Sequence, residues 1–105
     1  MKLSVIVPAY NERSTIAELL RRVCDVPIAK EIIVVDDGSV DGTVAELERL
    51  GLNESGEPLI RRGGGDVRNE LRLLRHTRNQ GKGASIRDGI AAATGDILLI
   101  QDADL

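Results

Sequence analysis

The chain has 105 residues, of which 42% are hydrophobic and 30% are charged, and its formal net charge is −3. This length and balance fit one small globular domain. The acidic charge and the presence of a single aromatic residue, Tyr10, argue against a nucleic-acid-binding protein, which typically has a basic face and aromatic stacking platforms.

Predicted strands and helices alternate along the chain. Within residues 14–24, Ile16, Leu19, Leu20 and Val23 recur at the spacing of one helical face. The predicted elements, in chain order, are a strand over 3–10, a helix over 14–24, a strand over 31–39, a helix over 41–50, a strand over 71–74, a helix over 83–95 and a strand over 96–100.

This alternation predicts an α/β fold with a Rossmann-like open parallel sheet and helices on both faces. Right-handed crossovers make 3-2-1-4 the expected order of the four strands. The apolar runs "IIVV" and "ILLI" are typical of strands that are covered on both faces. In the last helix, Ile86, Ile90 and Ala93 form one stripe, which predicts that the helix packs through them.

Residues 51–70 break the pattern, because they contain five glycines and show no periodicity. A stretch of this length without regular structure is uncommon in a compact domain. Two interpretations stay open. One is a mobile surface insertion, and the other is a basic flap in which Arg61, Arg62 and Arg68 lie over an anionic ligand.

Polar clusters follow every predicted strand. They are "PAYNE", "DDGS", "RNQGKG" and "QDADL". In an open parallel sheet, ligands bind beyond the carboxyl ends of the strands, near the point where the strand order reverses. We therefore expect these four clusters to meet at one edge of the sheet and to form a binding site there.

The last cluster contains Asp102 and Asp104, which face the same way if the segment is extended. Two carboxylates about 5 Å apart repel each other by about 3 kcal/mol at an effective dielectric constant near 20. A cation relieves that repulsion, and carboxylate oxygens suit Mg²⁺ or Mn²⁺. An isolated D-x-D is also typical of a solvated turn, but the preceding apolar strand and the convergence of clusters favour a metal site.

The "DDGS" cluster predicts a second acidic turn. We expect Asp36 to bind backbone N–H groups around the Gly38 turn, and Asp37 to accept a hydrogen bond from a nucleobase N–H or a ribose hydroxyl. Simple turn and cap chemistry is the alternative for both residues.

The "PAYNE" cluster ends the first strand. Tyr10 has the size to cover a nucleoside, and Asn11 or Glu12 has the chemistry to hydrogen-bond one. Capping of the next helix by residues 11–14, and a Tyr10 buried in the core, are the alternatives.

The "GKG" cluster is not a phosphate-binding P-loop, because His76 and Gly83 stand where that motif requires glycine and Ser or Thr. A dinucleotide fingerprint is also excluded, since no glycine-rich turn follows the first strand. The remaining prediction is a tight turn into a helix, with Lys82 close to a phosphate.

In order and spacing, these motifs resemble the nucleotide-binding half of family 2 glycosyltransferases of the GT-A fold. The segments that carry the resemblance are "VIVPAYNE", "EIIVVDDGSVDGT", "RNQGKGASIRDGI" and "AAATGDILLIQDADL". The phrase "GDILLIQDADL" most resembles the branch that makes polyprenyl- or dolichyl-phosphate sugars. The resemblance covers the chain outside residues 51–70, and it is specific for the family rather than for the sugar.

The resemblance implies that residues 1–105 form a partial GT-A domain that binds a nucleotide-diphosphate-sugar donor. In the family, the P-x-Y-N-E segment and the second aspartate of DDGS hold the nucleoside. The D-x-D pair binds a divalent metal on the diphosphate, and its first aspartate also lies near the ribose. The predicted sites are Pro8, Ala9, Tyr10, Glu12, Asp37, Lys82 and Asp102 for the donor, and Asp102 and Asp104 for Mg²⁺ or Mn²⁺.

The chain departs from the family pattern after the D-x-D, where family members continue into an acceptor site. We therefore expect residues 1–105 to bind the donor without transferring sugar, and to self-associate through the open edge of strand 96–100. A polyprenyl or dolichyl phosphate is the expected acceptor. Two alternatives stay open: a non-catalytic nucleotide-binding module, and a nucleotidyltransferase-like enzyme, which would want a glycine-rich phosphate loop after the first strand.

Three further features bear on location. The single cysteine, Cys24, excludes an internal disulfide and is typical of a reducing compartment. No apolar run approaches the length of a membrane span, and the apolar start "MKLSVIVPAY" is too short for a signal peptide. The sequence predicts a cytoplasmic location, and the resemblance adds the inner face of the membrane for the full-length protein.

Overall fold

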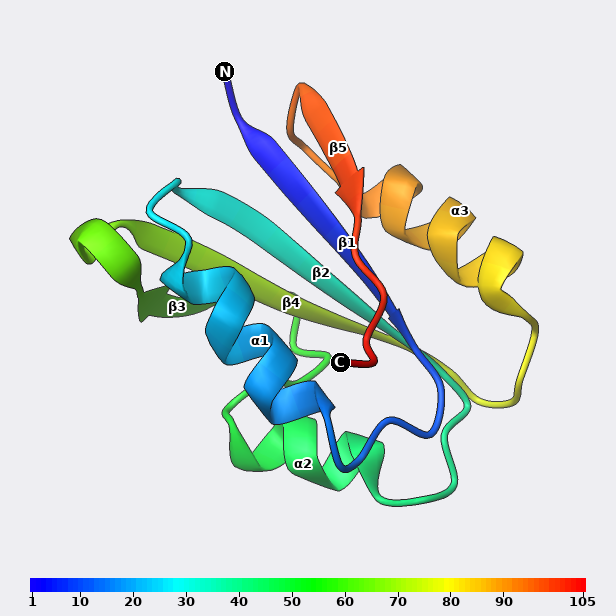
Figure 1. The fold of residues 1–105 in the computed structure, drawn as a ribbon. Helices are drawn as coiled ribbons and strands as arrows, with labels where there is room; N and C mark the ends of the chain where they lie inside the picture. The colour runs from blue at the N-terminus through cyan, green and yellow to red at the C-terminus, as the bar shows by residue number, and fades with distance from the viewer.

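The computed structural model describes residues 1–105 and contains a five-stranded sheet, three α-helices and one short 3₁₀ helix (Figure 1). Strands and helices alternate as predicted, with one extra strand inside residues 51–70. The elements are β1 (Leu3–Ala9), α1 (Ile16–Asp25), β2 (Lys30–Asp37), α2 (Thr43–Arg49), β3 (Leu59–Arg62), η1 (Gly64–Asp66), β4 (Arg68–His76), α3 (Lys82–Ala92) and β5 (Ile97–Ile100).

The sheet has the strand order β3-β4-β2-β1-β5. Strand β1 pairs in parallel with β2 and with β5, and β2 pairs in parallel with β4. The four parallel strands therefore follow the predicted order 3-2-1-4, and their carboxyl ends meet at one edge. The prediction differs at the far edge, where β3 adds an antiparallel fifth strand beside β4.

The extra strand shows that residues 51–70 are not devoid of regular structure. Two glycines of the β3–β4 hairpin pack against the end of α1. A Cβ atom on Gly63 would lie 1.8 Å from the carbonyl oxygen of Cys24, and one on Gly64 would lie 1.9 Å from that of Asp25. These glycines therefore allow a close approach of two backbones, although in the sequence they look like a flexible loop.

The interpretation of this segment as a basic flap over a ligand is wrong. Arg62 pairs with Arg68 across the hairpin, and the neighbouring Asn69 pairs with Lys30, the first residue of β2. The arginines thus lie at the amino ends of the parallel strands. The polar clusters lie at the opposite, carboxyl edge, so the hairpin cannot cover a ligand bound there.

The helices cover both faces of the sheet, as predicted (Figure 1). The main core lies between the sheet and helices α1 and α2. Its fully buried members include Val7, Ile16, Ile32, Val34 and Leu47.

Helix α3 packs against β1 and β2 on the other face, and it does so through small residues. Ser85 and Gly89 are buried, and a Cβ atom on Gly89 would lie 2.5 Å from Cγ2 of Ile6. Ile90, by contrast, is 45% exposed. The predicted apolar stripe is therefore wrong at Ile90, while Ile86 and Ala93 are half-buried. The close approach of α3 to the sheet requires small side chains at the contact.

Strand β5 is an edge strand that pairs only with β1. All four of its side chains are exposed, from 40% for Ile100 to 51% for Leu99. The two apolar runs therefore differ: "IIVV" is fully buried, whereas "ILLI" is not covered within residues 1–105. As for the helices, none combines the length and the hydrophobicity that a membrane-spanning segment requires.

Candidate functional site

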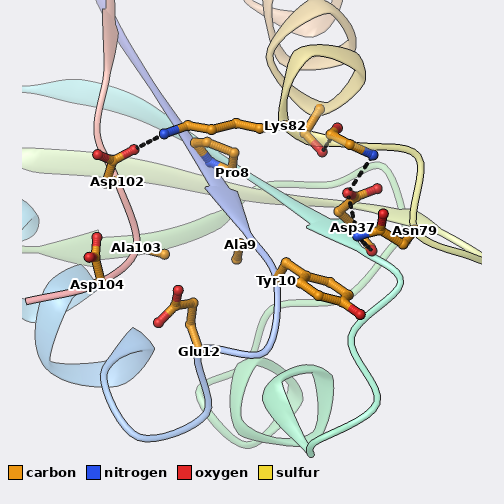
Figure 2. Close-up of a pocket in the computed structure, with 12 residues that line it drawn as sticks. Pro8, Ala9, Tyr10, Glu12, Asp37, Asn79, Lys82, Asp102, Ala103 and Asp104 are labelled. Atoms are coloured by element: carbon orange, nitrogen blue, oxygen red, sulfur yellow. Dashed lines mark hydrogen bonds and ion pairs between the residues drawn. The ribbon is translucent and has the colours of Figure 1, made fainter.

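A cavity of about 350 Å³ lies at the carboxyl edge of the parallel strands (Figure 2). The cavity brings together all eight residues that the sequence predicts for the donor and metal sites. Four further residues, which were not among the predicted site residues, also line it. The lining residues are Pro8, Ala9, Tyr10, Glu12, Asp37, Asn79, Gly81, Lys82, Ser85, Asp102, Ala103 and Asp104.

The loop after β1 forms one wall of this cavity. Tyr10 is 45% exposed, so the alternative of a core tyrosine is wrong. Asn11 has a left-handed backbone (φ 53°), and its side-chain Oδ1 accepts a hydrogen bond from the N–H of Val40 at 2.9 Å. The N–H of Glu12 donates to Oγ1 of Thr43 at 2.9 Å. These bonds fix the β1–α1 loop to the β2–α2 loop, and the Asn11 side chain is part of that contact.

The carboxylate of Asp37 is buried and fully hydrogen-bonded. Its Oδ1 accepts from Nδ1 of His76 and from the N–H of Gln80, both at 2.8 Å. Its Oδ2 accepts from Nδ2 of Asn79 at 3.0 Å and from the N–H of Gly81 at 2.8 Å. Burial opposes the charge, but the hydrogen bonds outweigh it and lower the pKa of Asp37. Asp37 thus holds the β4–α3 loop in place at the cavity wall.

The side chain of the neighbouring Asp36 points to the opposite face of the sheet. Its Oδ2 accepts a hydrogen bond from the N–H of Ser39 at 3.0 Å, which agrees with the predicted turn around Gly38. Its Oδ1 is buried and has no partner. Gly38 itself has a φ of 76°, and a Cβ atom there would lie 2.5 Å from the carbonyl carbon of Arg78. Only glycine allows the two loops of the site to meet this closely.

His76, which the sequence analysis did not place in any site, connects Asp37 to α3. Its Nδ1 lies 2.8 Å from Oδ1 of Asp37, and its Nε2 lies 2.6 Å from Oδ2 of Asp88. The hydrogen bonds to Asp37 and then to Asp88 raise the pKa of His76. A doubly protonated imidazole donates to both carboxylates, so a charged His76 links β2, β4 and α3 behind the cavity.

The D-x-D segment is anchored by its central residue. The side chain of Ala103 is buried, and its carbonyl oxygen accepts a hydrogen bond from Oγ1 of Thr15 at 3.0 Å. Asp102 and Asp104 flank this anchor and line the cavity. Oδ1 of Asp102 accepts a hydrogen bond from Nζ of Lys82 at 2.5 Å, and 58% of the Asp102 side chain is exposed.

The electrostatics of this corner fit a divalent cation. The hydrogen bond to Asp102, aided by the charge of Asp104, raises the pKa of Lys82, so an ammonium group acts as a stand-in cation at the carboxylate. The chain has no group of three or more His, Cys, Asp or Glu side chains placed to hold a metal by itself. Two carboxylates with further oxygens from a diphosphate are a typical Mg²⁺ arrangement. Asp102 and Asp104 could therefore hold a metal that arrives with the nucleotide.

An open, mostly parallel sheet with an acidic, lysine-containing cavity at its carboxyl edge defines an α/β protein whose cavity lies where such sheets bind their ligands. The model of "Glycosyl transferase family 2" matches residues 4–105. The chain therefore belongs to glycosyl transferase family 2, as the resemblance implied, and this membership decides against a nucleotidyltransferase-like enzyme.

Two curated relatives are similar over essentially the whole chain. A dolichol-phosphate mannosyltransferase of Pyrococcus furiosus is 32% identical over 100% of this chain and 26% of its own length. An undecaprenyl-phosphate 4-deoxy-4-formamido-L-arabinose transferase of Salmonella choleraesuis is 34% identical over 99% of this chain and 29% of its own length. The chain thus spans little more than a quarter of the length of these relatives.

Two solved structures share the fold. The mannosyltransferase PcManGT of Pyrobaculum calidifontis, in complex with GDP-Man and Mn²⁺, is 32% identical with a TM-score of 0.74, over 98% of this chain and 27% of its own. TarS 1-349 of S. aureus, in complex with UDP, is 29% identical with a TM-score of 0.76, over 99% of this chain and 28% of its own. The predicted α/β fold of GT-A glycosyltransferases is confirmed by these likenesses.

Proposed function

We propose that residues 1–105 are the donor-binding region of a metal-dependent glycosyltransferase that takes sugar from a nucleotide-diphosphate-sugar. The observation that carries this proposal is the cavity, which gathers all eight predicted residues at the carboxyl edge of the sheet. The neighbours solved with UDP and with GDP-Man and Mn²⁺ support it.

Asp102 and Asp104 are the proposed metal residues, for Mg²⁺ or Mn²⁺. A divalent cation bound there would neutralise charge on the diphosphate leaving group as a Lewis acid. The chain's own contribution is to hold the two carboxylates outward on either side of the buried Ala103, with Thr15 fixing the backbone between them. Lys82 supplies a positive charge that lies against Asp102.

The nucleoside is proposed to bind on the side of Pro8, Ala9, Tyr10, Glu12 and Asp37. The exposed ring of Tyr10 offers an apolar surface, and the carboxylate of Glu12 lines the same cavity (Figure 2). Oε2 of Glu12 accepts a hydrogen bond from Oγ1 of Thr15 at 3.2 Å, and its other oxygen is an available acceptor. Asp37 already accepts four hydrogen bonds, so its effect on the nucleoside includes the order that it imposes on the β4–α3 loop. We expect Asp37→Ala to weaken nucleoside binding both with and without metal, by about 1–3 kcal/mol.

The donor and the acceptor are proposed from the relatives. The relatives are named as dolichol-phosphate and undecaprenyl-phosphate sugar transferases, which supports a polyprenyl phosphate acceptor for the full-length protein. Those relatives use some three to four times as many residues, so we propose that residues 1–105 bind the donor and do not transfer its sugar. A cytoplasmic location, at the inner face of the membrane for the full-length protein, is proposed from the free Cys24 and from the proposed lipid-phosphate acceptor.

A thermal-shift panel of UDP-, GDP- and dTDP-sugars, with and without Mn²⁺, tests the proposal. We expect one nucleotide to raise the midpoint of unfolding when Mn²⁺ is present and to have little effect in excess EDTA. The control is Asp104→Asn, which should lose the metal-dependent part of the shift. A panel in which no nucleotide shifts the wild-type chain at any metal concentration would contradict donor binding. Transfer of sugar to a lipid phosphate by these residues alone would contradict the need for further residues.

We also propose that β5 mediates self-association between two copies of this chain. Its four apolar side chains are 40–51% exposed, and its outer edge has no partner strand. Such an edge is a template for pairing. Light scattering over a concentration series should show dimers that Leu99→Lys dissolves, whereas Val40→Lys, at a residue that is 84% exposed in a loop, should not. A wild-type monomer at tens of micromolar would contradict this proposal.

A further inference from the structure

Lys82 pairs with the carboxylate of Asp102, which is one of the two predicted metal residues. Nζ of Lys82 lies 2.5 Å from Oδ1 of Asp102, and the structure gives the lysine no other ion-pair partner. The lysine is the first residue of α3, directly after Gly81, whose φ is 101°. The turn and the start of the helix therefore direct the Lys82 side chain across the cavity toward Asp102, which follows β5 (Figure 2).

An ammonium ion and a divalent cation cannot both lie against the same carboxylate oxygen without repelling each other. A metal on either oxygen of Asp102 also lies close to the ammonium group and is repelled by it, which favours release of Lys82 from the carboxylate. The displaced lysine stays tethered at the amino end of α3, within the same cavity, where the only group of opposite charge brought by the ligand is the diphosphate.

We propose that Lys82 is a built-in counter-ion of Asp102, which a metal displaces and which then binds the diphosphate of the donor. This inference rests on the proposed function and adds an order of events to it. Metal alone binds weakly, because the Lys82–Asp102 pair opposes it. Metal and nucleotide together bind well, because the released lysine gains a new partner. By reciprocity, each ligand strengthens the binding of the other.

The proposal predicts that one substitution has opposite effects on two ligands. Lys82→Met keeps the apolar stem of the side chain and removes its charge. Without nucleotide, its affinity for Mn²⁺ should rise by about two- to fivefold, the range that exposed ion pairs correspond to. With Mn²⁺ saturating, its affinity for a nucleoside diphosphate should fall about tenfold, because a charged hydrogen bond to phosphate is lost.

The experiment is a titration of Mn²⁺ followed by electron paramagnetic resonance of the free ion, and a calorimetric titration of UDP and GDP at saturating Mn²⁺. Arg87→Met is the matched control, because Arg87 is an exposed cation on the same helix with no ion pair. It should change neither affinity as Lys82→Met does. In an Asp102→Asn background, Lys82→Met should give no gain in Mn²⁺ affinity, since the pair no longer exists.

A Lys82→Met chain that binds Mn²⁺ no better than the wild type overturns the counter-ion, even if its nucleotide affinity falls. An equal gain from Arg87→Met overturns it as well, because the effect would then be one of general charge. The wild-type arm tests the proposed function separately: no nucleotide binding with saturating Mn²⁺ would contradict donor binding itself.

Discussion

Two aspartates at the same edge of the sheet are held in opposite ways. Asp37, after β2, is 3% exposed and accepts four hydrogen bonds from the chain. Asp102, after β5, has a side chain that is 58% exposed and receives one lysine. The first carboxylate has its hydrogen-bonding capacity filled by the protein, whereas the second keeps most of it for a ligand. Asp37 therefore holds the loops of the site together, whereas Asp102 presents negative charge to a bound ligand.

The largest expected effect is on stability. Asp37→Ala removes a buried acceptor and leaves His76 and two backbone N–H groups without it, so we expect the free energy of unfolding to fall by about 2–4 kcal/mol. Urea unfolding measures this change. Asp102→Ala is the matched variant and should leave the midpoint of unfolding where it is. Equal losses from both substitutions would break the contrast between the two aspartates.

The second prediction concerns the glycine that lets the two loops of the site meet. Gly38→Ala should lower the free energy of unfolding by about 1–3 kcal/mol, because its new methyl group collides with the backbone of Arg78. Gly56→Ala is the control: its φ is 84°, but nothing lies within 4 Å of the added Cβ. The difference between the two variants isolates the collision from the backbone strain. If both variants lose the same amount, the close approach is not what requires glycine.

The third prediction, with the smallest effect, concerns pH. The pKa of His76 is raised in the folded chain, so its stabilising contribution is complete below its ordinary value of 6.5 and is lost as the pH rises through the folded pKa. Asp37 has a lowered pKa, and its contribution is lost only as the pH falls below its ordinary 3.8. We expect urea unfolding to show higher stability near about pH 6 than near about pH 9.

His76→Gln should shrink that pH difference, since glutamine cannot carry the charge that Asp37 and Asp88 stabilise. The comparison of variant with wild type cancels other groups that titrate in the same range. An unchanged difference in His76→Gln would show that the imidazole is not charged between the two carboxylates.

The sequence predicted the parallel order of four strands and the meeting of their polar ends, because apolar periodicity and right-handed crossovers depend on local pattern. It did not predict β3, since a four-residue strand with mostly exposed side chains has no buried face to impose a period. It also missed how α3 packs. Gly89 approaches Ile6 closely, and a contact made by a glycine leaves no apolar signal in the pattern.

Within the site, the sequence predicted which residues lie together, but it did not predict the hydrogen bonds and ion pairs that each of them forms. The spacing of Asp37 from its partners in residues 76–81 gives no sign that they bond, because the contact joins segments about forty positions apart. The same holds for Lys82 and Asp102, which lie on different elements. Both contacts depend on the register of β2 with β4 and of β1 with β5, which only the folded chain sets.

We infer that the D-x-D carboxylates need a metal to accept a diphosphate, whereas binding of the nucleoside at the wall around Asp37 does not need one. Calorimetric titration of UDP and GDP into the wild type and into Asp104→Asn, each with Mn²⁺ and with excess EDTA, tests it directly. We expect one nucleotide to bind the wild type at least about tenfold more tightly with Mn²⁺, a difference of about 1.4 kcal/mol, and Asp104→Asn to lose most of that gain. Equal affinity of the wild type with Mn²⁺ and with excess EDTA would contradict it.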